Sequence, residues 1–170
     1  MQVVRRVFIF LLMLGLVFHM LSPIAHAWQA SVISVSDGDS FKVKRDTRIL
    51  KVRLYGIDSP EMNQAHGRPA RNIARQWLIP GRQVEVEPMY RDNYGRIVAL
   101  VWAQDTLVNA ELVRSGAAWV YPRFCRSREI CEPMVDMQEE ARQARRGLWQ
   151  EQQPEPPWQW KKRHFQSERR

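Results

Sequence analysis

The stretch SVSDGDSFKV, residues 34–43, sets an Asp-Gly-Asp sequence between two segments in which apolar and polar residues alternate. Asp-Gly in this setting predicts a β-hairpin, because glycine accepts the positive φ that tight hairpin turns need. The turn accounts for Gly38 but leaves the second carboxylate without a reason. Asp39 is therefore either one more turn residue or a group held there to bind a ligand.

Segments on both sides of this turn predict further strands. In 50–55 the apolar residues Leu50, Val52 and Leu54 share one face, which leaves Arg53 on the polar face. A second hairpin is expected around the turn at 92–95. The expected strands are 32–35, 41–44, 50–55, 84–86 and 97–102, with a short one at 117–121.

Helical spacing of apolar residues follows in three segments. Pro69 is suited to the first turn of one helix, which should end at Pro80-Gly81. A short helix is expected over 109–115 and a longer one from Pro133 to about 148. Five short strands and about three helices predict an α+β fold, a small closed five-stranded barrel of the OB type with helices.

The first 27 residues predict an export signal, with two arginines before a mostly apolar run and a small-x-small pattern that ends at Ala27. Cleavage after Ala27 leaves residues 28–150 as one domain. The expected location is the periplasm or the external medium, without a permanent membrane span. The alternative is an uncleaved anchor, although a span needs roughly 20 unbroken apolar residues.

Residues 151–170 mix prolines, charges and aromatic residues without a helical or strand period, so we expect an extended basic tail. Trp158 and Trp160 are candidates for docking on the domain. The lysines and arginines of the tail either touch phosphates or form a solvated end.

The formal net charge of +8 favours a polyanionic partner without identifying it. Cys125 and Cys131 lie close together in an exported chain, which predicts a local disulfide. Two separate buried thiols are the alternative, and a zinc site is disfavoured because few histidines are present to complete it. We predict no stable protein partner and expect a monomer.

Charged and polar residues gather at the ends of the expected strands. Each one alone fits a turn or a solvated strand end. As a set they supply hard oxygen ligands for a divalent cation, a base for water and guanidinium groups for phosphate oxygens, which phosphodiester cleavage needs. The set is Asp39, Arg53, Asp58, Ser59, Glu61 and Arg96.

The motifs DGDS, RLYGIDSPE, DNYGR, VNAELVRSGAAWVY and GLW follow one another in this order over most of residues 31–149. In these motifs the chain resembles the staphylococcal nuclease (thermonuclease-like) family. The resemblance implies an OB-fold barrel and a calcium-dependent nuclease that acts on DNA and RNA. It further implies one calcium ion, held by Asp39, Asp58 and the backbone carbonyl of Ser59, where the family usually has threonine.

The same resemblance matches Arg53 and Arg96 to the two phosphate-binding arginines and Glu61 to the carboxylate usually proposed as general base. We expect calcium to hold a phosphate oxygen, Glu61 to orient or deprotonate a water, and the arginines to balance developing charge. The family's products carry 3′-phosphates. The link NQAHGR, residues 63–68, is shorter than the substrate-side loop of the best-known member, so substrate preference stays open.

Three aromatic residues near the motifs, Tyr94, Trp119 and Tyr121, offer surfaces on which unpaired bases can stack, although core packing is the commoner fate of such residues. A nucleic-acid-binding OB module without catalysis is the main alternative function. An exported adaptor for a protein or lipid partner is another, and it predicts no metal dependence.

Overall fold

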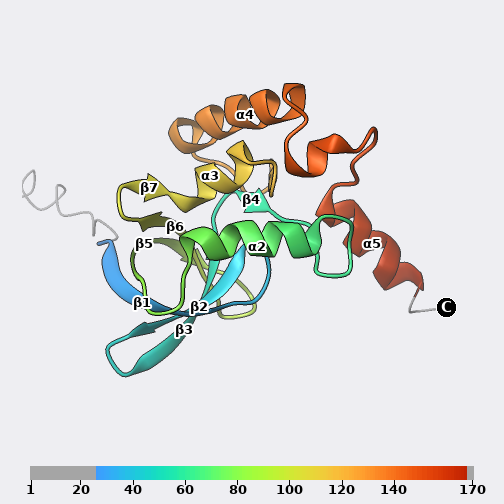
Figure 1. Cartoon of the computed structure of the whole chain (residues 1–170). Coiled ribbons are helices and arrows are strands. Elements are labelled where there is room, and N and C mark those ends of the chain that lie inside the picture. The colour runs from blue at the N-terminus through green and yellow to red at the C-terminus, as the bar shows by residue number, and fades with distance from the viewer. Residues whose placement is uncertain (1–25, 168–170) are drawn as a thin grey trace, which may run out of the picture.

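The computed structural model describes residues 26–167, so the expected leader lies outside the described residues except for its last two positions. Five strands follow one another in the order β3-β2-β1-β5-β6, and β3 also pairs with β6, which closes the sheet into a barrel (Figure 1). The expected OB-type barrel is thereby confirmed. Its strands are β1 (Trp28–Val35), β2 (Ser40–Arg45), β3 (Arg48–Leu54), β5 (Gln83–Arg91) and β6 (Ile97–Ala103).

Alternation along the strands fills the interior of the barrel. Val52 of β3 pairs with Phe41 of β2 on one side and with Ile97 of β6 on the other, and all three are buried. The contact of β3 with β6 is parallel, whereas the other pairs in the barrel are antiparallel. Because β3 joins β6 only from Val52 onward, the outer part of the β2–β3 hairpin projects beyond the closed barrel (Figure 1).

In the part of the chain that the structure describes, four α-helices and one 3₁₀ helix accompany the barrel, where about three helices were expected. Figure 1 shows α2 crossing in front of the barrel, α3 and α4 above it, and α5 apart at the right, beside the loop that precedes α2. Short strands β4 (Ile57–Asp58) and β8 (Trp119–Val120) pair with each other, and β7 (Thr106–Leu107) extends the main sheet. The helices are α2 (Gly67–Trp77), α3 (Val108–Arg114), α4 (Arg128–Gln143), the 3₁₀ helix η1 (Gly147–Gln150) and α5 (Pro157–Ser167).

Two sequence predictions about the helices are wrong. Helix α4 begins at Arg128, not at Pro133, which lies inside it. Pro133 is the sixth residue of the helix, beyond the first four N–H groups that have no internal partner, so it removes one internal hydrogen bond. The predicted extended tail contains α5, in which Pro157 takes the first helical position that favours proline.

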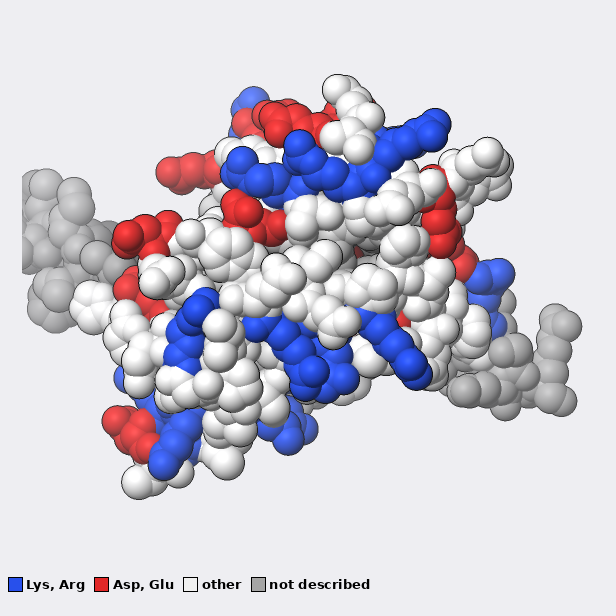
Figure 2. Space-filling view, in the orientation of Figure 1, with Lys and Arg blue, Asp and Glu red and all other residues white. Residues whose placement is uncertain are grey.

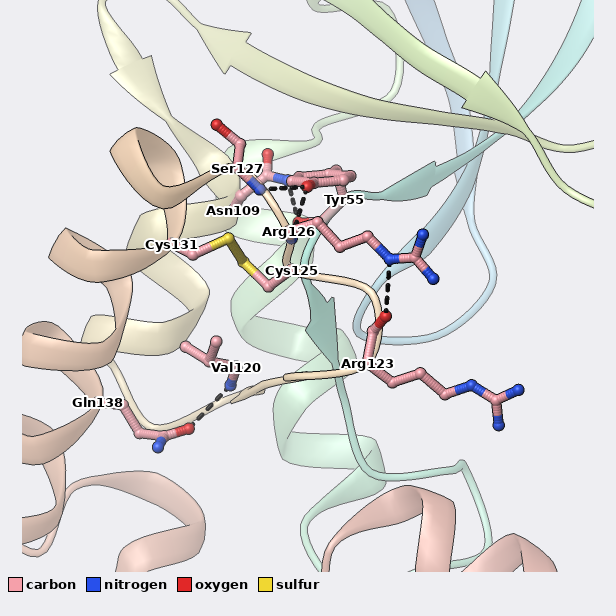
Figure 3. Close-up of a disulfide and its surroundings, with 9 residues drawn as sticks. All are labelled: Tyr55, Asn109, Val120, Arg123, Cys125, Arg126, Ser127, Cys131 and Gln138. Carbon is pink, nitrogen blue, oxygen red and sulfur yellow. Dashed lines mark hydrogen bonds between the residues drawn. A yellow bond between two sulfur atoms is a disulfide. The ribbon is translucent and has the colours of Figure 1, made fainter.

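The expected disulfide between Cys125 and Cys131 is present, with Cα atoms 5.7 Å apart. Figure 3 shows how it joins the loop after Tyr121 to the first turn of α4. The hydroxyl of Tyr55 accepts hydrogen bonds from the backbone N–H groups of Arg126 and Ser127, so the same loop is also held to the end of β3. Among the described residues no helix has both the length and the apolar composition to cross a membrane.

Candidate active site

Asp39 lies just before β2 and is buried, with 3% of its surface exposed. Its carboxylate accepts hydrogen bonds from the hydroxyl of Ser40 at 2.8 Å and from the backbone N–H of Ser59 at 2.8 Å. The neighbouring Gly38 does not have the positive φ expected for the turn. Glycine is required there for another reason, since a Cβ would lie 2.6 Å from Oγ of Ser59.

Arg53 joins the two buried carboxylates of the site. The β2–β3 register sets Ser40 opposite Arg53, so Asp39 comes within reach of the guanidinium. Arg53 donates from Nη1 to Asp39 at 2.7 Å and from Nη2 to Asp58 at 2.5 Å. Two charge-assisted hydrogen bonds from one planar group fix its orientation.

Asp58 is held in place by the short β4–β8 ladder, in which it lies opposite Trp119. Only 1% of its surface is exposed. The contact between the two segments extends beyond the ladder, because the N–H of Tyr121 donates to the carbonyl of Gly56 at 2.8 Å. This ladder brings a carboxylate and an aromatic segment that lie sixty residues apart in sequence into one wall.

Helix α5 contributes Lys161, which the sequence analysis did not place in the site. Nζ of Lys161 lies 3.1 Å from Asp58 and 2.8 Å from the carboxylate of Glu61. The helix is anchored nearby, since Nε2 of Gln64 donates to the carbonyl of Glu155 at 2.7 Å. A basic cluster in the tail was the one available signal, but nothing local selects Lys161 from its neighbours.

Arg96 lies on a separate hairpin and makes no direct contact with the buried carboxylates that the structure records. Its Nε donates to Asp92 at 2.7 Å. It does line the same cleft as Arg53, Glu61 and Lys161, a cavity of about 620 Å³. Five of the six predicted site residues therefore lie together, through direct contacts or as near neighbours along the chain: Asp39, Arg53, Asp58, Ser59 and Glu61. The sixth, Arg96, lines the same cleft.

The three predicted stacking residues differ in their surroundings. Tyr94 is 83% exposed, and the guanidinium of Arg96 lies 5.4 Å from its ring centre. The ring of Tyr121 is stacked on Trp158 of α5, with centroids 4.6 Å apart and planes inclined by 3°. Trp119 packs edge-on against both Trp149 and Trp158. Trp158 thus docks on the domain as predicted, and it occupies one face of Tyr121.

The carboxylates titrate differently because their partners differ. Burial opposes ionisation of Asp39, but the charge of Arg53 and hydrogen bonds from Ser59 and Ser40 outweigh it and lower the pKa. Burial and the negative charge of Asp39 raise the pKa of Asp58. Burial and Asp39 also raise the pKa of Asp37 to about 7. Burial is thus the first cause of both raised pKa values, and Arg53 is what keeps the pKa of Asp39 low.

The donor chemistry of this cluster fits a hard divalent cation. Calcium takes carboxylate and backbone carbonyl oxygens and completes its shell with water. Asp39, Asp58 and the buried Ser59 offer such donors. Within residues 26–167, no group of three His, Cys, Asp or Glu side chains converges as a ready metal cluster, because Arg53 and Lys161 are turned to these oxygens.

The fold and the site together are a closed OB-type barrel that holds one arginine between two buried carboxylates. The family described as "Staphylococcal nuclease homologue" matches residues 51–151. An "Uncharacterized endonuclease" of Escherichia coli is 40% identical over 134 residues, which cover 78% of this chain and 84% of that protein. The chain belongs to the staphylococcal nuclease family.

Two further relatives match most of the chain. "Protein ParB" of Escherichia coli is 35% identical over 150 residues, with 83% of each chain covered. A "Micrococcal nuclease" of Shigella flexneri is 32% identical over 148 residues, which cover 80% of this chain and 83% of that protein. The matches therefore extend over most of the chain and not over a single motif.

Proposed function

We propose that this protein is an exported nuclease that hydrolyses phosphodiester bonds of DNA, RNA or both with one calcium ion. The observation that carries the proposal is the bidentate contact of Arg53 with Asp39 and Asp58, in the wall of a cleft that also contains Glu61 and Arg96. Membership of a nuclease family supports it. The leader pattern and the disulfide support export.

Calcium bound at Asp39, Asp58 and Ser59 would supply positive charge at a phosphate oxygen and lower the pKa of a bound water. Glu61 orients the attacking water or accepts its proton. Arg53 binds the phosphate and stabilises the charge that develops on it. Arg96 keeps Nε on Asp92, which leaves its terminal nitrogens for the leaving oxygen. We assign the products 3′-phosphate ends.

Digestion of single-stranded DNA and of RNA by the chain from Trp28 onward tests the proposal, with calcium, magnesium or a chelator. Calcium-dependent cleavage is expected. Glu61→Gln and Arg96→Gln should each lower kcat about 100-fold or more, the size typical of losing a positioned base or a charge-stabilising group. Glu129→Gln, an exposed glutamate on α4 outside the cleft, is the matched control.

A nucleic-acid-binding module without catalysis is the second candidate. The contact of Lys161 with Asp58 and Glu61 favours it, because an ammonium group already occupies oxygens of both carboxylates. A folded protein that binds both nucleic acids but cleaves neither in any metal, with the variants behaving like the wild type, would establish this function instead.

A further inference from the structure

A second groove lies beside the candidate active site, on the other side of the end of β5. Its volume is about 820 Å³. One wall is the projecting end of the β2–β3 hairpin, and the other is the last part of β5, with Ile97 and Leu50 between them. Tyr90 and Arg91 line both this groove and the active-site cleft. The two cavities are therefore adjacent parts of one surface.

Three arginines give the groove its charge, against a single lining acid, Asp46. Arg45 and Arg48 face each other directly across the β2–β3 ladder. Like charges in directly opposed positions destabilise a hairpin. Among the described side chains neither arginine has a carboxylate within salt-bridge distance, so this end of the hairpin keeps an uncompensated positive charge.

Aromatic rings line the groove together with these charges. Tyr90 is 41% exposed and is propped edge-on against Tyr55, with ring centroids 6.3 Å apart. Trp28 lies under the guanidinium of Arg45, 4.6 Å from its carbon. Arginines that meet phosphates and rings on which bases stack are the two parts of a site for single-stranded nucleic acid.

We infer that this groove binds the part of a single-stranded nucleic acid that flanks the bond in the active site. The inference rests on the proposed nucleic-acid substrate but not on its cleavage. Arg48 lies about 17 Å along β3 from Arg53 at the usual rise of a strand and on its opposite face. The two cavities meet at Tyr90 and Arg91, which line both, so a nucleic-acid strand would pass from one to the other over these residues. A nucleic-acid strand that reaches both arginines extends well past the scissile bond, so the groove favours oligomers over dinucleotides.

Figure 2 shows the basic side chains of one face, many of them over α2 and others near the hairpin, so net charge alone could attract a polyanion. The test must therefore compare variants of equal net charge. Arg45→Gln with Arg48→Gln removes two charges from the groove. Arg75→Gln with Arg145→Gln removes two exposed charges that line neither the groove nor the active-site cleft.

Fluorescence anisotropy of a labelled DNA strand of about 12 nucleotides, within the span of one OB fold, measures binding in chelator, where no cleavage occurs. The groove variant should bind about tenfold more weakly, and its log–log salt slope should be shallower by about 1.4, since each lost phosphate contact on a single strand accounts for about 0.7. The charge-matched control should keep the wild-type slope. Thermal midpoints of both variants verify folding.

Equal slopes for the groove variant and the wild type would overturn the inference and leave the proposed nuclease activity standing. Weakened binding in the groove variant without cleavage by any form of the protein would support the groove and refute the nuclease. Vesicles of phosphatidylserine and phosphatidylcholine are the second probe. If the groove variant loses vesicle binding while strand binding is unchanged, the groove takes a lipid surface and the inference is wrong.

Discussion

Asp37 shows how the environment of one residue sets its charge. The pKa of this carboxyl is raised from 3.8 to about 7, first by burial and then by the charge of Asp39. The folded protein therefore holds the proton more tightly than the unfolded chain does. The resulting stabilisation is complete below 3.8 and is lost as the pH rises through 7.

Replacement Asp37→Asn should remove this dependence, because an amide oxygen can still accept the N–H of Asp39 that Asp37 now accepts at 3.0 Å. The variant and the wild type should have similar unfolding free energies near pH 4. At about pH 8 the variant should be more stable by a few kcal/mol, as about 1.4 kcal/mol per pKa unit implies. Urea unfolding in chelator measures both, and parallel pH curves would contradict the assignment.

The neighbouring residues of the site differ in how far local sequence could predict them. Asp39 and Arg53 meet because the register of β2 and β3 sets Ser40 opposite Arg53. Asp58 follows Arg53 closely in the sequence. These contacts were within reach of pattern and spacing. Lys161 was not, because it meets Asp58 across 103 positions of sequence, and no local pattern encodes such a contact.

At the scale of single elements, α5 changes the charge balance of the site. Its Lys161 lies 3.1 Å from the carboxylate of Asp58, which would also bind a calcium ion. Lys161→Met should therefore raise calcium affinity about tenfold, or ~1.4 kcal/mol. Lys162→Met removes the same charge from an exposed neighbour on the same helix and should change affinity far less. Isothermal titration calorimetry measures the calcium affinity of each variant. Equal affinities for both variants would exclude competition between Lys161 and calcium.

The loop between β8 and α4 depends on the disulfide at its end. The Cys125–Cys131 bond closes a small loop, with a sequence separation of 6. Chain entropy gives about 2 kcal/mol for a loop of that size. Cys125→Ser with Cys131→Ser should lower the unfolding free energy by about this amount, measured by denaturant titration. As a check, the unfolding free energy of the wild type should fall by the same amount when the disulfide is reduced.

Elements were predicted well where one periodic pattern decides them, as in β3 and α2. Helix α5 was missed because its stability comes from tertiary contacts of Trp158 and Lys161, while the three prolines at 154–157 suggested an extended chain. The start of α4 was misplaced because Pro133 was taken as a first-turn residue. For α5, contacts distant in sequence outweighed the local signal.

The whole molecule has a barrel whose strands are joined all the way round and a helix that is joined to it at a few points. Strand amides are protected by ladders that close through β3–β6. Helix α5 depends on the ring of Tyr121, on Gln64 and on the ion pairs of Lys161. Elements that are held by few contacts unfold locally more often than the rest of a protein does.

Hydrogen exchange followed by mass spectrometry should therefore show α5 exchanging faster than the amides of β2, β3 and β6. Trp158→Ala should accelerate exchange in α5 further and leave the barrel protected, because it removes the stacked ring and no barrel contact. Equal protection of α5 and the barrel strands would mean that the helix unfolds only with the whole domain.

The 103 positions between Asp58 and Lys161 also set an order in time. A chain that is being made, or that is passing through a membrane from its beginning, produces every carboxylate of the site and all five barrel strands before residue 161 appears. The barrel can fold at that stage with Asp58 and Glu61 lacking their lysine. The ammonium group therefore reaches a site whose carboxylates are already assembled, and the resting charge of that site is established by the last of its side chains to be synthesised.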